Sequence, residues 1–153
     1  MRNWMAAIML ISAACADSGA PATSTMTQPT TGSFAASLNA FRADQGQGAV
    51  TTNRRLQRAA QAHAEDMERR GYFSHQSVGG PNGTSMSDRI AASGYRACAA
   101  AENIAQGQKS ESEVFEAWRR SAGHRRNMLG PRYVEYGLGR SGNTWVQLLA
   151  AGC

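Results

Sequence analysis

The fold class is decided near the end of the chain, where residues 133–150 read YVEYGLGRSGNTWVQLLA. The segments Tyr133–Arg140 and Thr144–Ala150 contain the aromatic and apolar residues that are typical of strands. Ser-Gly-Asn lies between them and favours a tight turn, so the two segments are predicted to form an antiparallel hairpin. A further strand is expected just before Asn103.

Two helical patterns stand near the start of the predicted domain. The first begins after Ser33 as N-cap and is expected to end at Gly46. The second is expected over residues 53–70, with Gly71 as its C-terminal stop. His63 falls on the inward face of this helix. Because a single histidine there is more often packed in the core than functional, it is not assigned to a site.

The middle of the chain alternates loops and shorter helices. Residues 71–83 contain four glycines and a proline and are predicted to form a loop. A short helix is expected over residues 88–93, capped by Ser85, and another begins at the Ser-x-x-Glu sequence of residues 110–113 and is interrupted at Gly123. Helices interspersed with short strands and a final hairpin predict a three-layer α/β/α sandwich around a small mixed or antiparallel sheet.

The N-terminal residues have the character of an export signal. Residues 1–14 carry one positive charge followed by a short apolar run, which predicts a signal peptide. Cleavage before Cys15 would leave that cysteine for lipidation, whereas cleavage after Ala16 would release a freely secreted protein, and the sequence leaves both open. Residues 15–32 are small and polar and are expected to be a flexible tether, so the folded domain is expected over residues 33–153.

The cysteines agree with an exported location. If Cys15 is acylated or removed, Cys98 and Cys153 remain as a pair, and in an oxidising compartment we expect them to form a disulfide. The expected location is therefore periplasmic, membrane-anchored through a lipid, or secreted.

The charge balance limits the partners. The formal net charge is +5, and 15 of the 16 basic residues are arginines. These arginines are spread in pairs, without a zinc-finger spacing or an RNA-binding signature, so nucleic acid is not an expected partner. No run approaches the roughly 20 apolar residues of a membrane-spanning helix, so any membrane contact is expected through the lipid anchor. We expect a monomer.

Several short motifs occur in a fixed order. They are Gly71–His75 (GYFSH), Ala101–Ala105 (AENIA), Ala117–Trp118, Ser121–Leu129 (SAGHRRNML) and Glu135–Gly139 (EYGLG). Together they resemble the CAP superfamily (cysteine-rich secretory, antigen 5 and pathogenesis-related 1 proteins; SCP domain) in its bacterial branch. The resemblance extends from about residue 34 to the end. It implies the α/β/α fold of that family, with a central cleft lined by two histidines and carboxylates where some members bind a divalent metal, often zinc.

The positions that match this cleft are His75, Glu102 and His124, with Asp88 or Glu135 as a fourth group. The family pattern has a glutamate soon after the first histidine, and this sequence has none between His75 and Glu102. Two imidazoles and a carboxylate suit Zn²⁺ with one position open to water. A hydrogen-bonded polar cluster that stiffens the cleft is an equal alternative.

Two functions follow from these residues. The first is a noncatalytic binding module for a lipid, a peptide or a cell-wall component, which the resemblance favours because relatives include lipid binders. The alternative is a metal-dependent hydrolase. A serine hydrolase of the Gly-x-Ser-x-Gly type is not expected, because that motif is absent from the sequence.

Overall fold

The computed structural model describes residues 33–80 and 82–153. The predicted signal peptide (1–14) and tether (15–32), with the lipidation candidate Cys15, lie outside the described residues. The elements in chain order are α1 (Phe34–Asp44), β1 (Thr51–Thr52), α2 (Arg54–Arg70), α3 (Met86–Ala92), β2 (Ala97–Gln106), α4 (Glu111–Arg120), α5 (Ala122–Met128), β3 (Glu135–Ser141) and β4 (Thr144–Gly152).

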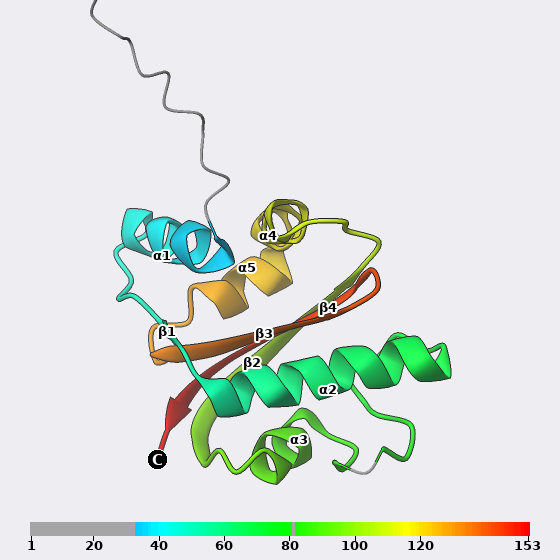
Figure 1. Ribbon diagram of the computed structural model, residues 1–153. Helices are drawn as coiled ribbons and strands as arrows, with labels where there is room; N and C mark the ends of the chain where they lie inside the picture. The colour runs from blue at the N-terminus through cyan, green and yellow to red at the C-terminus, as the bar shows by residue number, and fades with distance from the viewer. Residues whose placement is uncertain (1–32, 81) are drawn as a thin grey trace, which may run out of the picture.

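The strands form one four-stranded sheet in the order β1-β3-β4-β2. β1 pairs parallel with β3, and the other neighbours pair antiparallel, so the sheet is mixed. α1, α4 and α5 lie on one face and α2 and α3 on the other (Figure 1). The predicted α/β/α sandwich is confirmed.

The predicted hairpin is confirmed, and the strand before it is longer than expected. Ser141 pairs with Thr144, and Gly142 turns the chain at a positive φ of 54°. β2, however, continues through Asn103 to Gln106. The polar side chain of Asn103 does not end the strand because it is buried and donates to Oε1 of Gln147 on the neighbouring strand, at 2.8 Å.

Local capping fixes most helix boundaries. As predicted, Ser33 is the N-cap of α1, and Gly71 ends α2 in the left-handed conformation. Asn53, expected as the first residue of the second helix, is the N-cap of α2. α3 begins two residues earlier than expected, because Asp88 is the third helical residue of a capping box with Ser85.

The break after α4 also differs from the prediction. The chain is extended at Ser121, with φ −87° and ψ 123°, and this residue both ends α4 and begins α5. Gly123, the predicted point of interruption, lies inside α5.

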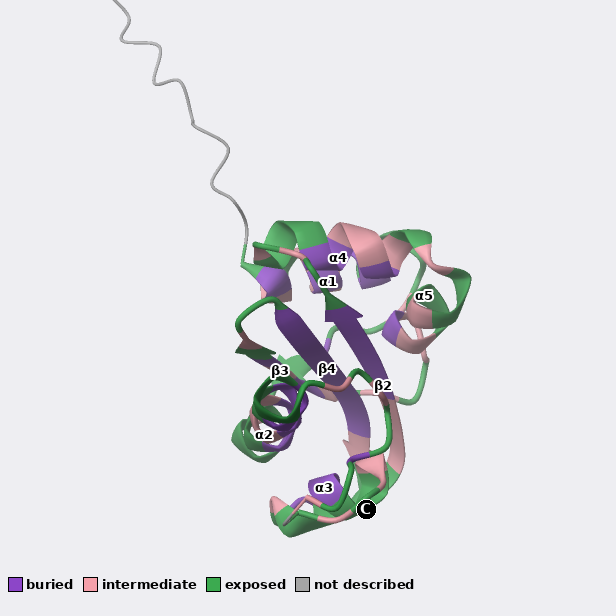
Figure 2. Cartoon of the chain, turned by 90° about the vertical axis from the view of Figure 1, so that its right-hand side faces the viewer, coloured by how far each residue is buried: buried purple, intermediate pink, exposed green. Residues whose placement is uncertain are grey.

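Each face of the sheet carries its own apolar core (Figure 2). Under α1 and α4, Trp118 is fully buried and packs with Phe34 and Phe115. Under α2, the core includes Leu56, Met67 and Val146. Burial of such side chains contributes about 1.5–3 kcal/mol each, so the two cores hold the helices in fixed positions against the sheet.

α2 lies unusually close to β3. Side chains on Gly137 and Gly139 would collide with the backbone of α2 at Leu56 and at Gln61, respectively. The glycines of the Gly-Leu-Gly sequence are therefore the contact surface for the helix. This close approach fixes the distance of α2 from the sheet.

Replacing Gly139 with alanine is expected to lower the free energy of unfolding by about 1–3 kcal/mol, because a methyl group must push helix backbone away. Urea unfolding followed by circular dichroism measures this. Gly123→Ala is the matched control: nothing lies within 4 Å of its added methyl, and it should be neutral or stabilising, because alanine favours the helix. Equal destabilisation by both changes would contradict the close contact.

The predicted disulfide between Cys98 and Cys153 is present, with their Cα atoms 4.9 Å apart. It joins the beginning of β2 to the residue after β4, and the backbone N–H of Cys153 also donates to the carbonyl oxygen of Arg96 at 3.0 Å. The end of the chain is thus fixed to the sheet. Within the described residues, no helix has the length and apolarity needed to cross a membrane.

Candidate functional site

Glu102 is the centre of a buried polar cluster on the edge strand β2. It shares a face of the strand with Ile104, which packs in the core under α2, so Glu102 points toward α2 and α3. Its Oε1 accepts from His75 Nδ1 at 2.8 Å, and its Oε2 accepts from Arg89 Nη2 at 2.7 Å. Both carboxylate oxygens therefore already have strong partners.

Arg89 links the loop before α3 to the Glu102 carboxylate through hydrogen bonds. Besides Glu102, its guanidinium donates to the carbonyl oxygens of His75 and Thr84 and to Ser77 Oγ, all at 3.1 Å. The side chain is only 3% exposed. Two contacts therefore position His75: its ring donates to Glu102, and its backbone carbonyl accepts from Arg89.

Arg89 was missed from sequence, because nothing local distinguishes an arginine on a short helix that turns inward from one that faces solvent. Its contacts are set by the path of the loop, which only the folded chain defines.

His63 on α2 is buried in the protein core, in line with the sequence interpretation, and it also lies next to the Glu102 cluster. Its Nε2 lies 3.0 Å from the carbonyl oxygen of Ser74 and 3.9 Å from Glu102 Oε1. Its Nδ1 is buried and has no hydrogen-bond partner among the described residues. His63 supports the backbone immediately before His75 and is a positioning residue.

His124 approaches from the opposite layer. It lies on α5, and its ring contacts that of Trp118 edge-on, with centroids 6.5 Å apart. Its carbonyl oxygen accepts from Asn103 Nδ2 at 3.2 Å, and Asn127 Nδ2 donates to the Glu102 carbonyl at 3.2 Å. α5 is therefore fastened to the open edge of β2, which brings His124 close enough for the charge of His75 to act on it.

The two candidates for a fourth group have other partners. Asp88 accepts from the backbone N–H groups of Thr84 and Ser85 in the capping box. Glu135 accepts from Asn53 Nδ2 and the Tyr95 hydroxyl. Both carboxylates are engaged in holding local structure.

The donor set does not fit a metal centre with three protein ligands. Among residues 33–80 and 82–153, no three histidine, cysteine or acidic side chains lie close enough together to hold a metal ion. Each oxygen of Glu102 already accepts one hydrogen bond, and the Arg89 guanidinium beside it would repel a cation. The expected His75, Glu102 and His124 ligand set is therefore incomplete as arranged, and zinc binding stays a prediction.

The environment shifts the two cleft imidazoles in opposite directions. The hydrogen bond to Glu102 raises the pKa of His75 above its usual value, despite partial burial. Burial lowers the pKa of His124, and the charge of His75 lowers it further. Because a carboxylate only accepts, His75 carries a proton on Nδ1, and its Nε2 is the nitrogen that it offers to a ligand. His75 is therefore the more readily protonated of the two imidazoles.

We expect an NMR titration of the imidazole resonances to give a midpoint above about 6.5 for His75 and below it for His124. Protonation of His75 stabilises the fold below about pH 6.5, and this contribution is lost as the pH rises through the folded-state pKa. His124 has the opposite sign: its contribution is present above about pH 6.5 and is lost as the pH falls toward its lowered pKa. Glu102→Gln should return the His75 midpoint toward its ordinary value. A His75 midpoint below that of His124 would contradict the arrangement.

A sequence model described as "CAP: Cysteine-rich secretory protein family" matches residues 35–149. An uncharacterized protein of Bacillus subtilis (strain 168), YkwD, is 40% identical over 111 residues, which are 71% of this chain and 42% of that protein. An uncharacterized membrane protein of the same organism, YlbC, is 31% identical over 101 residues, covering 66% of this chain and 28% of the relative. The chain thus matches less than half the length of these two proteins.

Solved structures show the same fold. An extracellular protein containing an SCP domain from Bacillus anthracis str. Ames has a TM-score of 0.69 and 26% identity, covering 74% of this chain and 37% of that one. An outer surface protein of Borrelia burgdorferi has a TM-score of 0.66 and 18% identity, covering 77% of this chain and 89% of that one.

Proposed function

Because the chain belongs to the CAP family of cysteine-rich secretory proteins, we propose that it is an exported envelope protein that binds a ligand in the cleft beside β2. The ligand class is a lipid, a peptide or a cell-wall component, and the cleft holds it through the imidazoles of His75 and His124. The protein binds this ligand without converting it.

The state of Glu102 is the observation that carries this proposal. The Arg89 guanidinium lies 2.7 Å from Glu102 Oε2 and disfavours a second cation there, and Oε1 accepts from His75 Nδ1 at 2.8 Å. The carboxylate instead orients His75, whose side chain is 54% exposed. The ligand therefore meets a rigidly held imidazole.

The loop that carries His75 favours an amphipathic ligand. Phe73 and Val78 are 47% and 62% exposed in this same loop, so both are available for apolar contact with a ligand held at His75. A protonated His75 would pair with a carboxylate head group. A fatty acid combines both properties and is the member of the proposed lipid class that we would test first.

Export is supported by the predicted signal peptide of residues 1–14 and by the similarity to the extracellular SCP-domain protein of Bacillus anthracis. Mass spectrometry of the mature N-terminus separates the two predicted forms. An acylated Cys15 would establish the membrane-anchored lipoprotein, and a free terminus at Asp17 would establish the secreted form.

Laurate is a suitable probe for the cleft. We expect saturable binding of laurate by the full chain, with NMR shift changes at Phe73 and His75. His75→Ala should weaken the affinity by about tenfold or more, the effect of losing one charge-assisted hydrogen bond. Gln76→Ala, which changes an exposed neighbour in the same loop, is the matched control and should bind as the native chain does. Laurate, a tripeptide and muramyl dipeptide all failing to bind would overturn the proposal.

Turnover distinguishes binding from catalysis. We expect no release of nitrophenol from p-nitrophenyl acetate above the blank, with or without added Zn²⁺. Turnover that disappears in a folded His75→Ala, His124→Ala variant would establish a hydrolase instead. The metal-dependent hydrolase left open by the sequence has no support from the donor set around Glu102 among the residues that the structure describes.

A further inference from the structure

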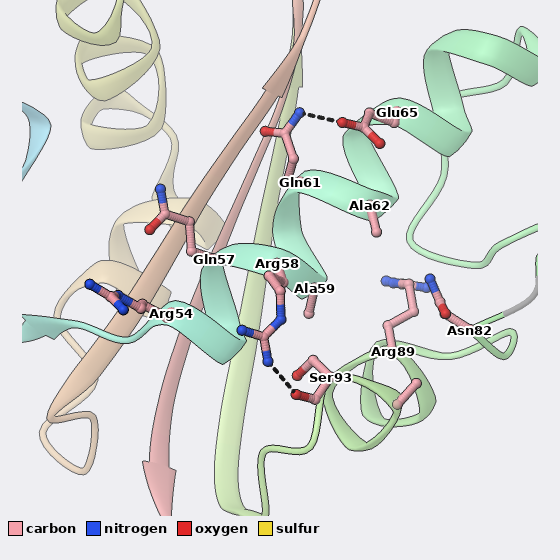
Figure 3. Close-up of a pocket in the computed structure, with 11 residues that line it drawn as sticks. Arg54, Gln57, Arg58, Ala59, Gln61, Ala62, Glu65, Asn82, Arg89 and Ser93 are labelled. Carbon is pink, nitrogen blue, oxygen red and sulfur yellow. Dashed lines mark hydrogen bonds between the residues drawn. The ribbon is translucent and has the colours of Figure 1, made fainter.

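A second candidate site lies between α2 and α3, away from the His75 ring. It is an open groove of about 710 Å³, drawn in Figure 3. This volume is in the range of small-molecule sites in proteins. The lining residues that matter here are Arg54, Arg58, Ala59, Ala62, Arg89 and Ala92.

The charge of the groove is unbalanced. Of the described residues that line it, three are arginines and Glu65 alone is acidic. Glu65 accepts from Gln61 Nε2 at 2.8 Å, whereas neither Arg54 nor Arg58 takes part in an ion pair among the described residues. The groove thus contains positive charge that no described side chain neutralises.

The positions of Arg54 and Arg58 near the N-terminus of α2 are electrostatically unfavourable for positive charge. The N-terminus of a helix carries a partial positive charge, which favours acidic residues, and like charges four positions apart repel. The first turn of α2 has no acidic residue and contains Arg54, and Arg58 follows four positions later. Bound negative charge would relieve this repulsion.

Two arginines of the groove are held in place. Arg58 reaches from α2 to α3 and donates to the Ser93 carbonyl at 3.1 Å (Figure 3). Arg89 approaches from α3 at the other end, beside Asn82 (Figure 3). The Arg89 side chain is almost fully buried, and its Nε has no partner among the described residues. An ordered guanidinium loses little entropy when it binds.

The small side chains leave room above these groups. Ala59 and Ala62 on α2 face Ala92 on α3, and their methyl groups provide a short apolar wall. A ligand here would combine an anionic group with a small carbon skeleton. Phosphate suits the anionic part, because two of its oxygens can accept together from the Arg58 guanidinium and its charge exceeds that of a carboxylate.

We propose that the α2–α3 groove is a binding site for an organic phosphate, in which Arg58 contacts the phosphate and Ala62 contacts the carbon skeleton. The groove shares Arg89 with the Glu102 cluster but does not include the His75 ring, and its test changes none of the residues of that cluster.

Glycerol 3-phosphate is the probe, titrated into the full chain at low ionic strength by NMR and calorimetry. We expect saturable binding that Arg58→Gln weakens by about tenfold or more, with a smaller loss for Arg54→Gln. Arg132→Gln removes the same charge from an exposed turn outside the groove and should leave the affinity unchanged. Ala62→Leu keeps the charge and the helix but fills the groove, and should also weaken binding.

Two results would overturn the site: equal weakening by Arg58→Gln and Arg132→Gln, which would indicate diffuse attraction, or unchanged binding by the Ala62→Leu variant. Equal affinity for succinate would overturn the assignment to phosphate.

Co-sedimentation with phosphatidylglycerol vesicles, compared with phosphatidylcholine vesicles, distinguishes the source of the phosphate. Binding to the former alone that is sensitive to Arg58→Gln supports a lipid head group as the ligand, and binding of the soluble probe alone supports a free phosphate ester. Failure of both probes would reject this site and leave the His75 proposal standing.

Discussion

The Arg89→Met variant is expected to lose about 3–5 kcal/mol of unfolding free energy, because it leaves the Glu102 carboxylate buried without its cationic partner. Methionine preserves much of the volume of the side chain. It cannot replace the donors to the Ser77 hydroxyl and to the His75 and Thr84 carbonyl oxygens, so the loop should loosen as well. Urea unfolding at pH 7 measures the loss, and hydrogen exchange across residues 74–84 locates the loosening.

A double-mutant cycle separates the ion pair from general damage. Arg89→Met combined with Glu102→Gln should be less destabilised than the sum of the two single variants, because neither buried charge then remains. Arg54→Met, which changes an exposed arginine of the adjacent helix, is the control and should change stability by no more than about 0.5 kcal/mol. Strict additivity of the two buried changes would show that Arg89 and Glu102 do not act as a pair.

The disulfide is expected to have the other large effect. Changing Cys98 and Cys153 together to serine should lower the unfolding free energy by about 4 kcal/mol, the loop-closure value for a separation of 55 residues. The bond is exposed at the end of the sheet, so its removal leaves both apolar cores intact and acts mainly on the unfolded chain. Denaturant unfolding of the two proteins gives the difference.

Treatment with a reductant is the control for the comparison of the native chain with the double serine variant. Dithiothreitol should lower the stability of the native chain to that of the serine variant and leave the variant unchanged. A native chain that is insensitive to complete reduction would mean that the bond contributes nothing to folding, contrary to the expectation.

Part of the candidate site could be predicted, and the rest could not. His75, Glu102 and His124 were found through motifs, and the structure brings His75 into contact with Glu102 and within the electrostatic reach of His124. Arg89 was not found, because its contact with Glu102 depends on distances across the fold. His63 is packed in the core as expected, and only the fold places it beside Glu102. Arg89 pairs with the Glu102 carboxylate, which also holds the His75 ring. Zinc binding at these residues stays a prediction.

By itself the sequence determined what short-range physics controls. Apolar periodicity and capping residues set α1, α2 and α4, the Ser-Gly-Asn turn set the final hairpin, and the cysteine count set the disulfide. Only the tertiary structure decided that a two-residue strand at Thr51–Thr52 joins the sheet, that β2 continues past Asn103, and that Arg89 enters the Glu102 cluster. The physical reason is that caps and turns are satisfied by residues a few positions away, whereas a buried polar group is satisfied by whichever partner the packing of distant segments brings to it.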